Sequence, residues 1–349
     1  MSALPATDSD RAWRKTLAPY ATSSLRRSLV DLATSVVPYL GLVVAMCFAL
    51  RVSVVLVVAL SIPAAGFLIR TFIVFHDCAH ASFFRSKRAN AMVGGAIGVL
   101  LWFPFGCWRH EHAVHHATSG DLDRRGVGDV RTLTVEEYRS SAWWARLGYR
   151  LFRNPFVMFG LGPLWVVLVG PRLVSPFAPA RIRRSVLGTD LALAAVGVGL
   201  WSLIGLEGLL LVEFVPLLLM GSAGIWLFYV QHQFEDAYWQ TNENWDYDQA
   251  ALAGSSHLVL PRVLQFFTGN IGLHHVHHLS ARIPNYNLQA AHDETGEFGG
   301  VPTLTLWDAV RCVRVKLWDE RQGRLVSFRE ARVQHPSTRP ALVADDGAT

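Results

Sequence analysis

A single stretch of this sequence, Trp108 to Val130, constrains the fold more than any other. It begins with WRHEHAVHH, in which four histidines lie within seven residues. In a helix, His112, His115 and His116 occupy positions i, i+3 and i+4, so their imidazoles share one face. Imidazole is a good ligand for iron, zinc, copper and nickel. The spacing therefore predicts one wall of a metal site, which other parts of the chain have to complete.

Two more histidine clusters supply the other walls of the predicted site. The segment HDCAH carries histidines at i and i+4, and HHVHH repeats the i, i+3, i+4 spacing. One zinc ion needs only three or four protein ligands, so eight or nine imidazoles indicate two metal ions with open positions. So many imidazoles favour iron and dioxygen over hydrolytic chemistry. The predicted ligands are His76, His80, His112, His115, His116, His232, His274, His277 and His278.

The composition is that of a membrane protein, because 51% of the 349 residues are hydrophobic and only 17% are charged. Soluble domains carry about 25% charged residues. Four apolar segments approach the ~20 residues needed to cross hydrocarbon, namely residues 33–50, 52–75, 189–205 and 209–230. The turns between them, at Arg51 and at residues 206–208, are short. We therefore predict four transmembrane helices in two hairpins.

This topology places every histidine cluster on one side of the membrane. The second and fourth segments end just before His76 and His232, and the cations before the first segment favour a cytoplasmic N-terminus. Residues 91–107 are apolar but interrupted by Gly and Pro, and we predict a re-entrant or interfacial segment. Residues 155–170 are expected to lie on the membrane surface or to insert shallowly. The predicted fold is thus an all-α integral membrane protein with a cytoplasmic helical cap.

The chain is predicted to be one membrane domain, residues 31–330, preceded by a cytoplasmic segment, residues 1–30, and followed by a disordered tail, residues 331–349. Its four cysteines form no CxxC pair, which indicates unpaired thiols in a reduced compartment. The arginines flank apolar segments and form no basic stripe with aromatics, so nucleic acid is not an expected partner. The sequence leaves the oligomeric state open.

Other polar residues are candidates for supporting roles, because a ligating imidazole usually donates its second N–H to a carboxylate or carbonyl. The candidate carboxylates are Asp77, Glu111, Asp121, Asp123, Glu235 and Asp236. His110 and His275 lie off the shared helical faces, and Asn270 lies one turn before His274. His257 and His292 are assigned no role. The apolar residues that could line a substrate tunnel, or simply pack in the core, are Phe75, Trp102, Phe103, Trp226 and Phe228.

The order HDCAH, HEHAVHH, HHVHH resembles the three histidine boxes of the membrane-bound fatty acid desaturase family. The flanking text HATSGDLDRRGVGDV, RNPFVMFGLGP, YVQHQFEDAYW and ARIPNYNL is similar to bacterial acyl-lipid desaturases that make Δ12 (ω6) double bonds. The resemblance runs from about residue 70 to 330. One departure is Ala79, where members of the family commonly have glycine.

The resemblance implies a non-haem di-iron centre held by the box histidines, with His232 as the additional ligand after the last transmembrane helix. It also implies an external electron donor, such as ferredoxin with its reductase. The expected reaction is the dioxygen-dependent removal of two hydrogens from an acyl chain, in a membrane lipid or on a carrier, leaving a cis double bond. The expected location is the bacterial cytoplasmic membrane, with the site facing the cytoplasm.

Three alternative functions stay open at this point. A hydroxylase, acetylenase or ketolase of the same superfamily would use the same irons on a lipid, a hydrocarbon or a carrier-bound acyl chain. A zinc hydrolase is disfavoured, because neither HExxH nor HxxEH occurs in the sequence. A haem or quinone protein is disfavoured as well, because these histidines follow the apolar segments rather than lying within them.

Overall fold

The computed structural model describes residues 13, 15–296, 298 and 300–334, and most of them are helical. The strands are only two or three residues long: β1 (Leu133–Thr134), β2 (His257–Leu258), β3 (Thr303–Leu304), β4 (Leu317–Asp319) and β5 (Arg324–Val326). The predicted all-α membrane class is therefore confirmed. Residues 331–334 of the expected tail belong to α16 (Phe328–Gln334), and residues 335–349 lie outside the described part.

The first predicted hairpin is formed by α2 (Leu25–Ala49) and α3 (Val54–Ala79), which pack along each other. Both helices are long and apolar enough to cross a membrane. α2 begins earlier than the expected boundary at residue 31. Their outward side chains are apolar, as at Phe48 and Val55, which are 68% and 78% exposed. Such surfaces need a lipid environment, because large contiguous apolar patches are rare on soluble proteins.

The second apolar region is a 53-residue helical run, Ala180–His232, that also passes as membrane-capable. It consists of α9 (Ala180–Leu209), the π-helix η4 (Leu210–Phe214) and α10 (Val215–His232). Gly205 interrupts the run with φ 72° and ψ 175°, immediately before the turn expected at residues 206–208. A crossing takes ~20 residues, so the run is long enough for two. Within the described residues, three helical segments are thus long and apolar enough to cross a membrane.

Two bent helix pairs complete the apolar part of the molecule. α4 (Lys87–Leu100) and α5 (Phe105–Thr118) meet at 105°, so α5 turns back toward the end of α3. This bend agrees with the re-entrant geometry predicted for residues 91–107. α7 (Trp143–Phe152) meets the following apolar run at 62°. That run contains η1 (Val157–Leu161), α8 (Gly162–Leu164), η2 (Trp165–Val169) and η3 (Gly170–Arg172).

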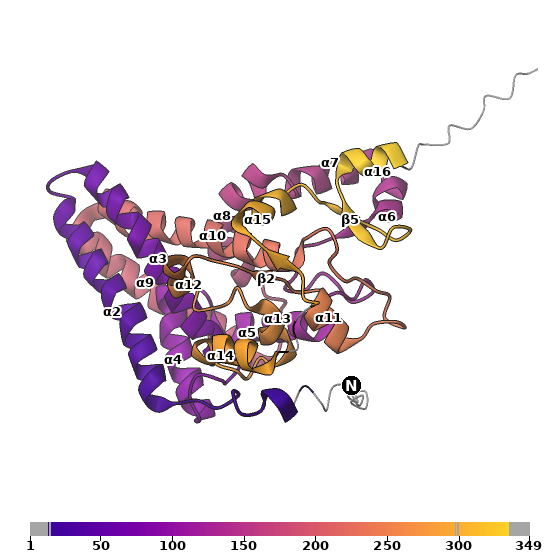
Figure 1. Cartoon of the computed structure of the whole chain (residues 1–349). Helices are drawn as coiled ribbons and strands as arrows, with labels where there is room; N and C mark the ends of the chain where they lie inside the picture. The colour runs from indigo at the N-terminus through magenta and orange to yellow at the C-terminus, as the bar shows by residue number, and fades with distance from the viewer. Residues whose placement is uncertain (1–12, 14, 297, 299, 335–349) are drawn as a thin grey trace, which may run out of the picture.

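The remaining elements form a cap beyond the ends of α3 and α10. In Figure 1, α2, α3 and α9 lie together on the left, and the part of the cap with β5 and α16 lies on the right. Its sheet has the order β1-β4-β5, with β1 parallel and β5 antiparallel to β4, and β2 pairs in parallel with β3. Its other helices are α6 (Val135–Ser140), α11 (Tyr247–Ala253), α12 (Arg262–Phe267), α13 (His274–Leu279), α14 (Asn285–Thr295) and α15 (Leu306–Cys312).

Candidate metal centre

Four helix ends bring the nine predicted ligand histidines together. The end of α3 carries the first box, α5 the second and α13 the third, and α10 ends at His232. Seven of the nine side chains are buried, and His80 and His112 are partly buried. The structure divides the nine into two groups, which we call the five-histidine group and the four-histidine group.

The five-histidine group has ligand nitrogens that all lie within 4.8 Å of one another. Its members come from all three boxes: His76, His80, His112, His116 and His277. The Nε2 atom of His116 lies 3.2 Å from that of His112 and 3.0 Å from that of His277. Imidazole nitrogens bound to one ion at about 2.1 Å lie about 3 Å apart when they are neighbours in its coordination sphere. The group therefore has the spacing that a metal ion requires.

The four-histidine group consists of His115, His232, His274 and His278, all buried, with ligand nitrogens again within 4.8 Å of one another. The Nε2 atoms of His232 and His274 are 2.9 Å apart. The two groups are adjacent, since the rings of His116 and His278 stack with centroids 4.2 Å apart. The donor set is thus two neighbouring clusters made of imidazoles alone.

Several of these nitrogens are buried without a hydrogen-bond partner, including Nε2 of His80, His115 and His278. Leaving such a group unpaired costs about 1–3 kcal/mol, so an orphaned buried nitrogen needs an explanation. A cation in each group would accept the free lone pairs. The residues present therefore fit two metal ions.

The imidazoles of the third box are neutral when no metal is bound. Burial holds the pKa of His274, His277 and His278 well below the ordinary value of 6.5, and the neighbouring imidazoles lower it further. Desolvation has this effect because it disfavours the charged imidazolium. Each ring consequently keeps a lone pair available for coordination at neutral pH.

The Nδ1 atoms of three ligand histidines each have a hydrogen-bonding oxygen atom of the chain as their partner. His115 Nδ1 donates to Asp129, His76 Nδ1 lies 3.2 Å from Asp77, and His232 Nδ1 donates to the carbonyl of Gly254 at 3.0 Å. A partner on Nδ1 leaves Nε2 free to face the metal. Asp77 thus lies where the sequence predicted a supporting carboxylate.

Asp129 was not among the six predicted carboxylates, although it belongs to the stretch that follows the second box. It reaches His115 through a loop in which Gly128 has φ 72°. A Cβ atom on Gly128 would lie 2.8 Å from the carbonyl oxygen of Glu111, so only glycine allows the loop to approach α5 this closely. The GVGD sequence was the available signal, but it has no helical spacing to link it to a histidine.

Asp77 also connects the metal centre to α2, the first membrane-capable helix. Its Oδ2 atom accepts hydrogen bonds from the backbone and side-chain nitrogens of Asn285, at 2.7 and 3.0 Å. The Asn285 amide also donates to Asp31 on α2, which pairs with Arg70 on α3. This network of α2, α3 and α14 fixes the backbone that presents the first box.

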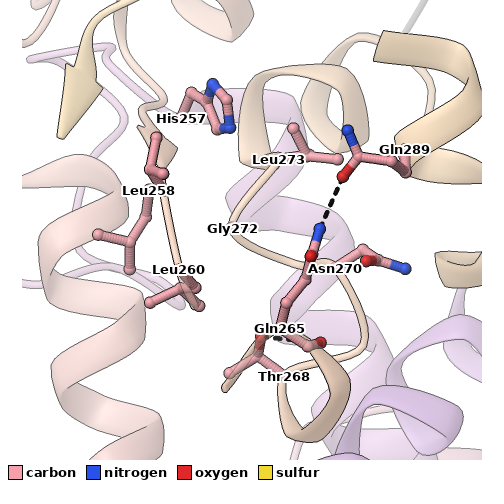
Figure 2. Close-up of a pocket in the computed structure, with 10 residues that line it drawn as sticks. His257, Leu258, Leu260, Gln265, Thr268, Asn270, Gly272, Leu273 and Gln289 are labelled. Carbon is pink, nitrogen blue, oxygen red and sulfur yellow. Dashed lines mark hydrogen bonds between the residues drawn. The ribbon is translucent and has the colours of Figure 1, made fainter. Parts of the chain in front are cut away.

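Asn270 does not reach the ligands. Figure 2 shows it in a small polar pocket of about 250 Å³, together with Gln265 and Gln289, whose side chains are hydrogen-bonded at 2.6 Å. Its own amide donates to the carbonyl of Asn285 at 3.1 Å, and its φ of 59° marks a turn before α13. Asn270 therefore positions α14 and the start of the third box rather than a ligand imidazole.

The other candidate supporting histidines and Glu111 lie apart from the two groups. His275 points to the opposite face of α13, where it is 3.1 Å from His292, and burial lowers its pKa to about 3. His292, assigned no role from the sequence, thus contacts a buried member of the third box that is not a predicted ligand. His110 is exposed on α5, and Glu111 contacts the thiol of Cys107 at 3.7 Å.

The other candidate carboxylates form contacts in the cap. Asp121 bonds Arg124 and Asn242, Asp123 accepts from the backbone of Asn242, and Glu235 pairs with Arg324. Asp236 is exposed. The structure therefore places these four acids in the framework around the site, away from the ligand nitrogens.

Most of the five apolar residues considered for a substrate tunnel pack in the hydrophobic core, which was the alternative given for them. Phe75 and Phe103 are buried in the main hydrophobic core, Trp102 packs on Phe214, and Trp226 packs against a second apolar cluster. Phe228 does border the site, with its ring 5.0 Å from that of His115. Trp108, for which no role was predicted, stacks on His112 with ring centroids 4.4 Å apart.

Comparison with known proteins agrees with this geometry. The model of the family described as "Fatty acid desaturase" matches residues 51–307. A "Fatty acid desaturase" of Bacillus subtilis is 46% identical over 315 residues, which is 90% of each chain. An "sn-1 oleoyl-lipid 12-desaturase" of Synechocystis is 29% identical over 281 residues, 78% of this chain and 75% of the relative.

A plant protein, the "Omega-6 fatty acid desaturase, chloroplastic" of Brassica napus, is 30% identical over 259 residues, which is 68% of this chain and 53% of the relative. The family match, residues 51–307, includes all three histidine boxes and His232. By sequence, helical architecture and histidine clusters, the chain belongs to the fatty acid desaturase family of oxidoreductases.

Proposed function

We propose that this protein is a di-iron desaturase that uses dioxygen to place a cis double bond in the acyl chain of a membrane lipid. The observation that carries the proposal is the division of nine imidazoles into groups of five and four in direct contact. Two adjacent groups of this size suit two ions that each keep a position for a non-protein ligand. Family membership supplies the reaction class.

When bound, the two irons would supply the oxidising chemistry that removes two hydrogens from adjacent methylene groups. The electron balance requires a donor: dioxygen takes two electrons with the two substrate hydrogens and two more, with two protons, from outside, and leaves as two waters. The protein holds the ions through the nine histidines. Trp108 packs on His112 and Phe228 on His115, so each histidine group has an apolar neighbour. In this proposal the methylene chain lies near the faces of these rings, which hold no polar group that it would leave unpaired.

The position of the double bond and the carrier form the finer part of the proposal. The relatives whose printed names specify a position are 12-desaturases or omega-6 desaturases, at 26% to 30% identity. On that support we propose Δ12 (ω6) desaturation of a lipid-linked chain. A carrier-bound substrate, or a hydroxylase, acetylenase or ketolase reaction at the same metal centre, is the competing possibility.

The proposed setting is the bacterial cytoplasmic membrane, crossed four times, with the metal centre on the cytoplasmic side and an external ferredoxin-type protein as electron donor. The distribution of cations supports this orientation. The connection between α2 and α3 contains a single cation, Arg51. The other end of this hairpin carries four cations: Arg26 and Arg27 at the start of α2, and Lys87 and Arg88 at the start of α4, just after α3. Lysine and arginine accumulate on the cytoplasmic side of membrane proteins.

Fatty acid analysis in a bacterial host that lacks the activity and supplies a ferredoxin tests the proposal. We expect gas chromatography–mass spectrometry to show a new cis double bond with the wild type and with His110→Ala, whose exposed imidazole lies outside both groups. His277→Ala, which removes a buried ligand, should give none. A new hydroxyl or triple bond instead would assign the protein to the competing reactions, and a double bond elsewhere would overturn only the Δ12 position.

A further inference from the structure

We propose that a groove at the start of α2 binds the phosphate headgroup of a membrane phospholipid. The groove has a volume of about 770 Å³ and lies between residues 19–27, residues 84–89 and Asn287 on α14. None of the nine ligand histidines lines it. The proposal is therefore independent of the metal centre and of the reaction proposed for it.

The groove is lined by groups that bind phosphate oxygens. Arg27 and Arg85 supply guanidinium groups, and Thr22, Ser24 and Ser86 supply hydroxyls. Guanidinium groups and hydroxyls both donate hydrogen bonds to phosphate, and the guanidinium bonds are charge-assisted. The two chain segments that meet here, residues 15–30 and 81–100, contain six lysines and arginines and no acidic residue. The carboxylates nearby are fewer: Asp31 interacts with Arg27 and pairs with Arg70, and Glu294 accepts a hydrogen bond from Tyr20, which lines the groove. Cations therefore outnumber carboxylates around the groove.

One of the two arginines is already fixed in place. Arg27 donates to the side-chain oxygen of Asn287 at 2.7 Å and to the carbonyl of Tyr286, and its guanidinium lies 4.5 Å from the centre of the Tyr286 ring. All these partners are neutral, so they hold the guanidinium without cancelling its charge. Such preorganisation lowers the ordering cost of binding an anion.

The position and the apolar side of the groove favour a lipid over free phosphate. α2 is a membrane-capable helix, so its first turn lies at the level where lipid headgroups meet hydrocarbon. Leu25 and Phe84 line the groove, and Leu25 and Leu29 on the first turns of α2 are 66% and 50% exposed. An acyl chain can lie along these side chains while the phosphate contacts the arginines.

Native mass spectrometry of the full-length protein in mild detergent tests the proposal, with phosphatidylglycerol and a phosphate-free galactolipid of the same acyl chains as probes. We expect one retained phosphatidylglycerol per chain and weak retention of the galactolipid. Arg85→Gln should lower the affinity about tenfold, the loss of one charge-assisted contact, whereas Arg85→Lys should retain most of it. Ala89→Phe, which fills the groove without changing charge, should weaken binding similarly.

Arg184→Gln is the matched control, because Arg184 is an exposed arginine near the start of α9, outside the groove. It should bind phosphatidylglycerol as the wild type does. Equal binding by the wild type and the Arg85→Gln variant, or equal retention of the two lipids, would overturn the proposal. If inorganic phosphate saturates the groove and phosphatidylglycerol does not compete with it, the groove binds free phosphate, which would also overturn the proposal. If Ala89→Phe does not fold, the Arg85 and Arg184 variants decide.

Discussion

At the scale of single residues, the orientation of a ligand imidazole depends on the hydrogen bond at its outer nitrogen. The Nδ1 atom of His115 is bonded to Asp129, that of His76 lies beside Asp77, and that of His232 is bonded to a backbone carbonyl. Each of these three rings therefore has Nε2 free to face the metal centre. Such partners orient the ring and make it a stronger ligand. Replacing one of these hydrogen-bond partners should therefore weaken metal binding, although every ligand histidine is still present.

Asp129→Asn is expected to lower the iron affinity about 10- to 100-fold, because a neutral amide oxygen accepts from His115 more weakly than a carboxylate and does not raise the basicity of the imidazole. The measurement is iron content per chain after dialysis against graded concentrations of a chelator. Asp236→Asn, at an exposed position, is the control and should behave like the wild type. Unchanged iron retention in Asp129→Asn would show that the contact with His115 has no effect on the metal.

Two glycines in the same loop make it possible to measure backbone strain separately from the effect of the loop's close approach to α5. Gly126 has φ 110° and open space around its Cα, whereas Gly128 has φ 72° and faces the carbonyl of Glu111. Alanine at either position costs on the order of 1–3 kcal/mol of backbone strain, because L-residues rarely adopt these φ values. Gly128→Ala should also displace Asp129 and so lower both the melting temperature and iron content further than Gly126→Ala does. Equal effects of the two variants would contradict a role for the close approach.

At the scale of helices, the division into two groups follows from residue spacing. Positions i and i+4 differ by about 40° around a helix, whereas i+3 and i+4 differ by about 100°. Accordingly His112 and His116 share the five-histidine group while His115 joins the other, and His274 and His278 share the four-histidine group while His277 joins the other. Each of these two helices therefore contributes to both groups, which holds them side by side.

The end of α10 is held against the cap by two buried cations. Arg153 donates to the hydroxyl of Tyr229 at 3.1 Å and to the side chain of Gln233 at 2.8 Å, beside His232. The ammonium group of Lys316 lies 5.5 Å from the centre of the Tyr229 ring, and burial, with the Arg153 charge, lowers its pKa to about 7. A helix C-terminus favours cations, which compensates part of this burial.

Lys316→Met should therefore raise the melting temperature most at or below pH 7, where the buried ammonium of the wild type is charged. In the unfolded chain lysine stays protonated to about pH 10.4. Between these values the folded wild type binds fewer protons than the unfolded chain, so its stability rises with pH and the advantage of the variant shrinks. Arg314→Met is the exposed control. A difference that is independent of pH would contradict the lowered pKa.

At the scale of the whole molecule, the sequence predicted the histidine clusters, the first hairpin and the re-entrant bend, because helical spacing and bilayer thickness are local constraints. It did not predict Asn285 behind Asp77, which lies 208 residues away in the chain. Nor did it predict that Trp108 stacks on His112, because a single tryptophan carries no periodic signal. Such contacts depend on how distant segments pack, which no local pattern specifies.

The proposed four-crossing topology places residues 50–53 outside and residues 84–88 in the cytoplasm. A membrane-impermeant maleimide applied to spheroplasts should label Arg51→Cys and leave Lys87→Cys unlabelled until the cells are lysed. Both substitutions belong in a Cys47→Ser background, because the other three cysteines are buried. Labelling of Lys87→Cys in sealed cells would reverse the proposed orientation.

The central claim is that the two histidine groups hold two irons in one chain. The most direct measurement is the metal content of the purified protein by elemental analysis, with Mössbauer spectroscopy of iron-57-enriched material. The account predicts two irons per chain in the wild type and a reduced content in both His116→Ala and His274→Ala, one from each group, with His110→Ala unchanged. A single iron per chain, or zinc in its place, would contradict the account.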